Sequence, residues 1–264
     1  MRTLRHVGTG LLALTLAAGL AACGDDDDDP EVTDTSEDVG SDPEEGSGAS
    51  EAFCGAVVDF NAAVTQVELD ETSTEADITA AGEQLSPLSE TLASDAPDDI
   101  ADAATELDAA VQDLNEGDAT AFNDDAIFET YTGMLTGAIE ACEFETVDVT
   151  GVDYAFEGVP ETLDAGAVAF AFANEGEEDH EMLIFRKADG VTETFEEIFS
   201  GPEEASEGKI EFSGVTFAPP GEESSTLADL SAGDYAMVCF IPVGGGEEGP
   251  PHVTEGMLQE FTVE

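Results

Sequence analysis

The chain has 264 residues, 41 % of them hydrophobic, which is enough for one large or two ordinary domains with buried cores. It carries 63 acidic residues against 5 Lys and Arg, a formal net charge of −58. Nucleic acid is excluded as a partner, because binding to phosphates needs clustered cationic side chains. At ~1 M salt the Debye length is about 3 Å, which screens such self-repulsion. We therefore predict adaptation to a salty environment. The alternative is a merely acidic secreted protein, and refolding across a salt series distinguishes the two.

Residues 1–22 have the features of a secretory signal peptide. Two basic residues, Arg2 and Arg5, precede a short apolar run that ends in small residues. The last residues of this run and the next one, Leu20-Ala-Ala-Cys23, resemble a bacterial lipobox, in which Cys23 becomes the lipidated first residue. The alternative is an ordinary signal peptide that happens to end at a cysteine. The lipobox predicts an exported protein, anchored to the outer face of the bacterial cell membrane, in a compartment that permits disulfides.

Residues 23–50 have a composition that predicts an acidic, disordered tether. Five consecutive Asp residues are followed by Glu, Ser, Gly, Thr and Pro, with almost nothing apolar. A segment with low hydrophobicity and high net charge cannot bury enough surface to order itself. We expect this tether to hold the folded part away from the membrane surface.

Apolar residues recur at helical spacing between residues 51 and 143. Four segments show the pattern: Phe53 to Val67, Ile78 to Leu92, Ile100 to Leu114 and Phe128 to Cys142. Pro87 lies inside the second segment, where it should kink or break the helix. Four helices with short connections predict an up-down-up-down bundle. No sequence feature indicates what this helical domain does.

The cysteines suggest one disulfide within the bundle. Cys54 begins the first helix and Cys142 ends the fourth, so both lie at the same end of an up-down-up-down bundle. The alternatives are two buried free thiols, or a pair between one of them and Cys239. The cysteine count favours Cys54–Cys142, because lipidation uses Cys23 and Cys239 then remains free.

From residue 144 to 264 the apolar pattern changes to the alternation of strands. Segments such as Val168 to Phe172 and His180 to Phe185 alternate, and Gly-containing turns separate them. The pattern of residues 194–199 predicts a short helix on a loop that connects two strands. Seven or eight short strands at this spacing predict a β-sandwich.

Four residues of this region suggest a metal site: His180, Cys239, His252 and Met257. The chain has only three histidines, and His6 lies in the expected signal peptide. Two imidazoles, a thiolate and a thioether suit copper. Zinc also takes Cys and His ligands, but Met is a poor ligand for it. Considered one at a time, Cys239 and Met257 are more typical of core residues, and His180 of a histidine at a strand end with its hydrogen bonds satisfied.

Three segments of the β region resemble the cupredoxin family of blue-copper proteins: 174–180, 233–239 and 252–257. The resemblance implies a Greek-key, antiparallel β-sandwich. It also implies His180 and His252 as nitrogen ligands, Cys239 as thiolate ligand and Met257 as weak axial ligand. Two departures stand out. Twelve residues separate Cys239 from His252, more than in plastocyanin-like proteins, and Glu181 replaces an Asn that ties the ligand loops together in several members.

The sequence therefore predicts an α+β multidomain protein, with a helical bundle (51–143) followed by a cupredoxin-like domain (144–264). The predicted function is one-electron transfer through a mononuclear copper site, without enzymatic activity. The alternatives are a copper storage or delivery protein, and a metal-free envelope scaffold or interaction module. We expect a monomer, tethered to the membrane by its lipid, with an unidentified redox protein as partner. That partner should dock on an exposed, apolar edge at His252.

Overall fold

The computed structural model describes residues 48–67, 69, 73–120, 125–201, 206–246 and 249–264. The predicted signal peptide, Cys23 and the tether up to residue 47 lie outside the described residues. The described residues belong to one compact unit. Within them, no helix is both long enough and apolar enough to cross a membrane.

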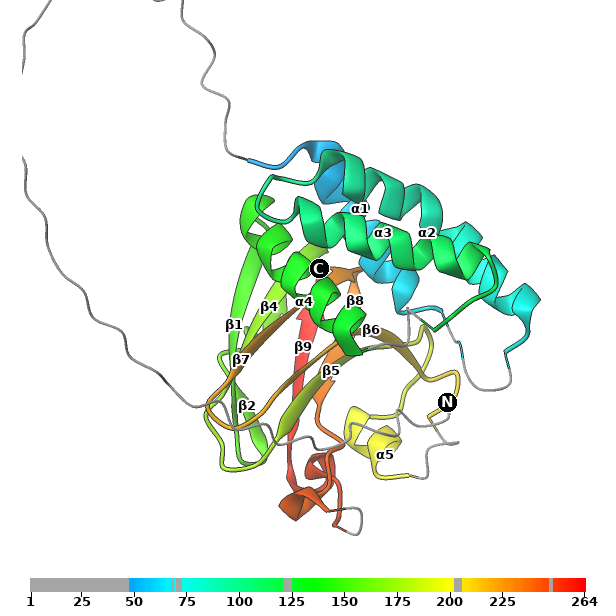
Figure 1. Cartoon of the computed structure of the whole chain (residues 1–264). Coiled ribbons are helices and arrows are strands. Elements are labelled where there is room, and N and C mark those ends of the chain that lie inside the picture. Colours follow the sequence, from blue (N-terminus) through cyan, green and yellow to red (C-terminus); the bar gives the residue numbers. More distant parts are fainter. Residues whose placement is uncertain (1–47, 68, 70–72, 121–124, 202–205, 247–248) are drawn as a thin grey trace, which may run out of the picture. The chain divides into compact units, whose positions relative to one another are not determined.

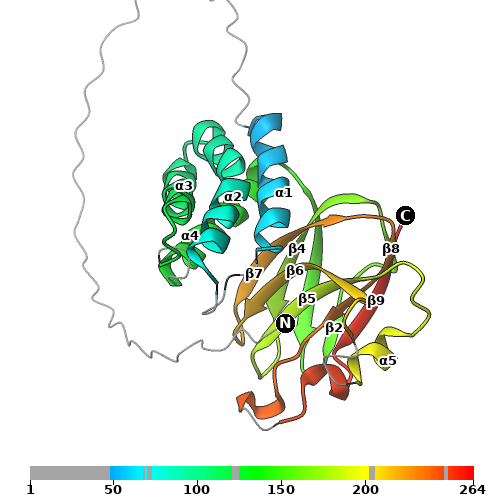
Figure 2. The same cartoon turned by 90° about the vertical axis from the view of Figure 1, so that its right-hand side faces the viewer.

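Four helices form the N-terminal layer (Figures 1 and 2). Their bounds are α1 Glu51–Val64, α2 Glu75–Asp95, α3 Ala101–Asn115 and α4 Asp125–Ala141. Side-chain caps fix two of the starts: Ser50 Oγ accepts from the backbone N–H of Phe53, and Thr74 forms a capping box with Asp77. α2 runs unbroken through Pro87, so of the predicted kink or break the break does not occur, and a kink stays a prediction. Buried Leu85 and Leu92, one on each side of the proline, hold both halves of α2 in the helical core.

The Cys54–Cys142 disulfide forms as expected, with the two Cα atoms 5.6 Å apart and a sequence separation of 88. It joins α1 to the residue that follows α4. Cys239 is a free, buried cysteine. The cysteine assignment made from the count therefore agrees with the structure for these three residues.

Two sheets and a short helix make up the rest of the chain. The bounds are β1 Glu145–Val152, β2 Ala155–Glu157, β3 Thr162–Leu163, β4 Gly166–Asn174, β5 His180–Lys187, α5 Phe195–Phe199, β6 Ile210–Ala218, β7 Glu223–Leu230, β8 Gly233–Val238 and β9 Leu258–Val263. A four-stranded sheet has the order β2-β1-β4-β7, and a five-stranded sheet has the order β3-β9-β8-β5-β6. The change from helices to strands falls between Ala141 and Glu145, as the sequence predicts. Whether residues 51–143 and 144–264 are separate domains stays a prediction.

Both sheets are mixed, so the prediction of a purely antiparallel sandwich is wrong. β1 pairs with β4 in parallel, and β3 pairs with β9 in parallel, while the other pairings are antiparallel. Along the chain, two short strands separate β1 from β4. β2 belongs to the four-stranded sheet and β3 to the five-stranded sheet. The chain thus crosses between the sheets and returns to β4 in the direction of β1. Side-chain alternation, which predicted the strands, is the same for either direction. The Greek-key connectivity remains a prediction.

β4 is buried on both faces, and its two faces carry side chains of different size. Val168, Phe170 and Phe172 point into the core between the sheets. Ala167 and Ala169 point the other way, into the core shared with the helices. Small side chains on this face let the helical layer lie close to the sheet.

A buried polar contact joins the helices to β7. Asn61 of α1 donates from Nδ2 to the backbone oxygen of Leu227 over 2.7 Å, and Asn61 Oδ1 accepts from the hydroxyl of Tyr131 on α4. Burial raises the pKa of Tyr131, so this hydroxyl stays protonated and can donate. A buried amide satisfied in this way fixes the position of α1 on the sheet.

Tyr235 anchors β8, the strand that leads to Cys239. Its hydroxyl donates to the backbone oxygen of Ser231 over 2.9 Å and accepts from the backbone N–H of the same residue over 3.0 Å. A tyrosine that bonds back to the backbone in this way is a known corner-fixing device of β-sandwiches. The anchor sets the start of the strand whose far end carries the thiol.

Candidate metal centre

Three potential ligand atoms converge inside the described part of the sandwich. His180 begins β5, Cys239 directly follows β8, and His252 opens the 3-10 helix η3 (His252–Glu255). One donor atom from each lies within 4.8 Å of the other two. The His180 Nδ1 and His252 Nδ1 atoms are 3.2 Å apart, and Cys239 Sγ is 3.4 Å from His252 Nδ1. All three side chains have an exposed fraction of 0 %.

His180 is positioned by a loop that folds around the buried side chain of Asn174. Asn174 Nδ2 donates to the backbone oxygens of Glu178 and Ala218, each over 2.8 Å. Asn174 Oδ1 accepts from the backbone N–H of Gly176 over 2.9 Å. The loop from β4 to β5 therefore has little freedom, and His180 enters the site from a fixed direction.

The long connection from Cys239 to His252 closes into a narrow hairpin, which explains how twelve intervening residues are accommodated. An isolated bridge pairs Pro242 with Pro251, and the backbone N–H of His252 donates to Ile241 over 2.9 Å. The 3-10 helix η2 (Val243–Gly245) lies beyond this bridge. Of the connection beyond this bridge, η2 lies at the end of the sandwich remote from helices α1–α4 (Figures 1 and 2).

Met257 is fully buried, and its backbone is hydrogen-bonded to the backbones of His252 and Cys239. Its N–H donates to the backbone oxygen of His252 over 3.0 Å, and its oxygen accepts from the N–H of Cys239 over 3.3 Å. Its side chain belongs to the core between the sheets. The structure thus brings all four predicted residues to one region. The donor atoms of three of them, His180, Cys239 and His252, lie within 4.8 Å of one another.

The donor set fits a metal ion of the copper or zinc type. Metal–imidazole bonds are about 2.0–2.1 Å and metal–thiolate bonds about 2.3 Å, so atoms 3.2 and 3.4 Å apart can both reach one ion. The Nε2 atom of each histidine faces a carboxylate. A neutral imidazole that donates from Nε2 has a lone pair on Nδ1. Two such lone pairs at 3.2 Å repel each other unless a cation or a proton lies between them. Two imidazoles and a soft thiolate favour copper.

Each imidazole has a carboxylate on its outer side. Glu178 Oε2 lies 3.3 Å from His252 Nε2, and Asp153 Oδ1 lies 3.4 Å from His180 Nε2. The first contact meets the geometry of a hydrogen bond, whereas His180 Nε2 has only the ion-pair contact. Carboxylates in this position orient metal-binding histidines and fix their tautomer. Neither acid was among the predicted site residues, although Glu178 lies within the segment 174–180 that resembles the cupredoxin family.

Glycines allow the close packing of His180. A Cβ atom added at Gly176 would lie 2.7 Å from His180 Nε2 and 2.6 Å from Asp153 Oδ1. A Cβ atom added at Gly151 would lie 2.8 Å from the ring of Phe172. Contacts this short require something to shift, so Gly176 leaves room for the ring of His180 and Gly151 leaves room for the ring of Phe172.

Glu181 ties the ligand segments together in a different way from an asparagine. Its Oε1 accepts from the backbone N–H of Phe240 over 2.9 Å, which links β5 to the residue after Cys239. Burial raises the pKa of Glu181, and the bond from Phe240 opposes this shift. The link therefore exists, but a carboxylate accepts where an amide could also donate.

Burial affects the protonation of Cys239 and His180 in the metal-free protein. It raises the pKa of Cys239 to about 12, and the charges of Glu181 and Glu178 act in the same direction. It also lowers the pKa of His180, with a further contribution from His252. At neutral pH the thiol is therefore protonated, and binding of a thiophilic cation would release that proton.

The structure corrects our expectation of an exposed histidine edge. The exposed fraction of His252 is 0 %. Glu178 covers its Nε2 atom, and the ring of Tyr154 lies edge-on to it with centroids 5.1 Å apart. The long connection does not expose this histidine, because its hairpin is held by Pro242 and Pro251 while Glu178 also accepts from the backbone N–H of Gly244.

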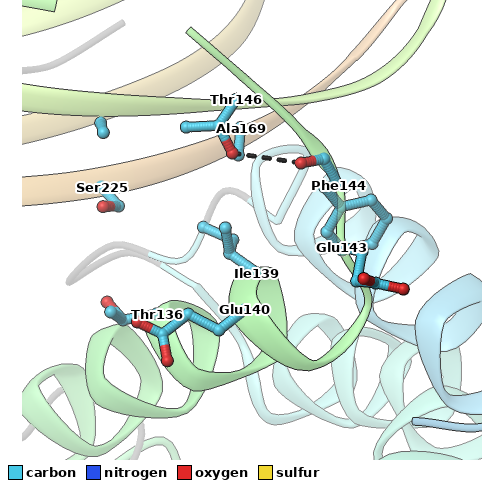
Figure 3. Close-up of a pocket in the computed structure, with 9 residues that line it drawn as sticks. Thr136, Ile139, Glu140, Glu143, Phe144, Thr146, Ala169 and Ser225 are labelled. Atoms are coloured by element: carbon cyan, nitrogen blue, oxygen red, sulfur yellow. Dashed lines mark hydrogen bonds between the residues drawn. The ribbon is translucent and has the colours of Figure 1, made fainter. Parts of the chain in front are cut away.

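A separate crevice lies between α4 and the four-stranded sheet, as Figure 3 shows. Its volume is about 330 Å³. Its lining residues are Thr136, Ile139, Glu140, Glu143, Phe144, Thr146, Ala169, Ala171 and Ser225. None of these offers a thiol or an imidazole, so the candidate metal chemistry belongs to the buried site in the sandwich.

No protein-family model and no curated protein sequence matches the chain. Among solved structures, an auracyanin from Roseiflexus castenholzii is 17 % identical, covering 45 % of this chain and 96 % of its own, with a TM-score of 0.30. Auracyanin A from Chloroflexus aurantiacus, described as a blue copper protein, is 19 % identical, covering 45 % and 98 %, with a TM-score of 0.29. Rusticyanin from Thiobacillus ferrooxidans is 21 % identical, covering 46 % and 78 %, with a TM-score of 0.28. These similarities are too weak to support a function, so the functional argument rests on the site itself.

Proposed function

We propose that this chain is a cupredoxin-like copper protein that carries one electron at a time. His180, Cys239 and His252 would hold the ion, with Met257 as weak axial ligand. The observation that carries the proposal is the convergence of two Nδ1 atoms and one Sγ atom in a fully buried site. Copper, when bound, would supply the one-electron chemistry by alternating between Cu(II) and Cu(I).

The surrounding chain is suited to holding such a site still. Asn174 fixes the loop before His180, Glu181 binds the segment after Cys239, and Tyr235 anchors β8. A site whose ligands hardly move loses little energy to rearrangement when its charge changes. Because the ligand side chains are fully buried, a substrate molecule would have to displace protein to reach them. This burial favours electron transfer over catalysis on a bound substrate.

Voltammetry of the copper-loaded protein on an electrode tests this function. We expect a reversible one-electron wave, with the copper retained in both oxidation states because the ligand segments are braced. A copper storage or delivery protein would instead lose its metal quickly to a chelator and give no reversible wave. Such loss, with no wave, would contradict electron transfer while leaving the copper site itself intact.

We also propose that the protein is exported and tethered by lipidation of Cys23. The support is the sequence alone: the lipobox-like Leu20-Ala-Ala-Cys23 after a short apolar run. Replacement of Cys23 by serine should release the protein from membranes. Intact-mass analysis of membrane-extracted protein should find acyl chains, and their absence would refute the anchor.

A further inference from the structure

We propose that Asp153 and Glu178 form an anionic outer layer of the metal site, which positions the two imidazoles and favours the more highly charged, oxidised state of the bound ion. Asp153 contacts Nε2 of His180 and Glu178 contacts Nε2 of His252, one carboxylate per imidazole. The inference rests on the proposed function, because it concerns how this chain would tune copper. It assigns a positioning role to two acids outside the ligand set.

Glu178 occupies the centre of a small network. Its Oε1 accepts from the hydroxyl of Tyr154 over 2.9 Å, and its Oε2 accepts from the backbone N–H of Gly244 and contacts His252 Nε2. These contacts leave the carboxylate a single orientation, with one oxygen directed at the imidazole. Glu178 thereby also connects His252 to the hairpin beyond Pro242 and Pro251.

Asp153 holds the other imidazole from the turn between β1 and β2. Its Oδ1 accepts from the backbone N–H of Glu177 over 2.9 Å and lies 3.4 Å from His180 Nε2. A Cβ atom at Gly176 would clash with Asp153 Oδ1 and with His180 Nε2, so the glycine permits these two atoms to come close to each other. His180 Nε2 is a buried polar atom that lacks any other partner among the described residues.

The turn that carries Asp153 is strained. Tyr154, the residue after Asp153, has a φ of +66°, a left-handed conformation that non-glycine residues rarely adopt and that clusters at functional sites. In this conformation the turn places Asp153 against His180 while Tyr154 contacts both Glu178 and the ring of His252. One turn thus supports both imidazoles.

Two negative charges in contact with the ligand imidazoles should act on the ion through those rings. An imidazole that donates to a carboxylate is a stronger donor to a metal, and the charges themselves stabilise the oxidised ion more than the reduced one. Their contact with the imidazoles makes the effect resistant to salt. At ~1 M salt, where the Debye length is about 3 Å, charges elsewhere on this acidic surface are largely screened.

The test compares Glu178→Gln, Asp153→Asn and their combination with Asp179→Asn, an exposed acid of the same loop. Each change removes one charge and keeps the side-chain shape. Reduction potentials are measured at low salt and at ~1 M salt, together with the rate of Cu(II) loss to a chelator and the melting temperature of the metal-free protein. We expect both site variants to raise the potential, the pair to raise it most, and the shift to survive in high salt. Loss of Cu(II) should be faster in each, with little change in the rate of Cu(I) loss.

The inference is overturned if wild-type protein binds copper with its thiolate band but the site variants shift the potential no more than Asp179→Asn does. It is also overturned if they lower the metal-free melting temperature while leaving potential and Cu(II) loss unchanged, because the role would then be structural. Failure of the proposed function looks different: the wild-type protein would give no thiolate band at all.

Discussion

Replacing Cys239 by serine is expected to abolish the intense thiolate-to-copper absorption band and to lower Cu(II) affinity by orders of magnitude. The sulfur is the only thiol within reach of the two Nδ1 atoms among the described residues, at 3.4 Å from that of His252. A serine hydroxyl is neither ionised nor soft, so it cannot replace the thiolate as a copper ligand. Serine is close to cysteine in size, so the strand should keep its place, with a cost of about 1–3 kcal/mol if the hydroxyl finds no partner.

The matched control replaces the other two described cysteines, Cys54 and Cys142, by serine. This double variant keeps Cys239 and should retain the full band, because the disulfide belongs to the helical layer and the donors to the sandwich. Visible absorption and competition with a chelator measure both effects. Stoichiometric Cu(II) binding that survives Cys239→Ser would place the metal elsewhere.

Removal of the Cys54–Cys142 disulfide is expected to lower the free energy of unfolding by up to about 4–5 kcal/mol. The bond joins residues with a sequence separation of 88, and in the chain-entropy model the stabilisation grows with the length of the closed loop. A Cys54→Ala/Cys142→Ala variant measures the effect by denaturant unfolding at high salt, where charge repulsion is screened. Non-reducing peptide mapping of the parent should first recover this pair and leave Cys239 unpaired.

Two outcomes would contradict this account of the helical layer. A disulfide that contains Cys239 as the main species would refute both the pairing and the copper site. A double variant that unfolds within about 1 kcal/mol of the parent would show that packing of α1 and α4 on β7, with the buried contact of Asn61, already supplies the constraint.

The residues of the site that belong to rare residue types in this chain, histidine and cysteine, could be predicted from the sequence. Only three histidines occur, and two of them converge with Cys239. The strands were also predictable, because large and small residues alternate along segments such as β4. The short helix α5 lies where its pattern placed it, at Phe195–Phe199.

Other features depended on tertiary contacts that no local pattern encodes. The parallel pairings of β1 with β4 and of β3 with β9 leave the alternation unchanged. Asp153 and Glu178 resemble the many solvated acids of the chain. Two sequence signals were available: Glu178 lies within the segment 174–180, and Asp153 precedes Tyr154, one of only three tyrosines. Burial of His252 was missed because the family resemblance implied an exposed edge at the second histidine, whereas a bridged hairpin and Glu178 cover the ring.

Titration of the metal-free protein with Cu(II), followed by visible absorption, tests whether this chain binds one copper ion through Cys239 and two histidines. We predict an intense thiolate band that grows linearly, saturates at one equivalent of Cu(II), and disappears on reduction. Saturation with no such band, or binding of several equivalents that high salt removes, would show that copper associates with the acidic surface and would contradict the account.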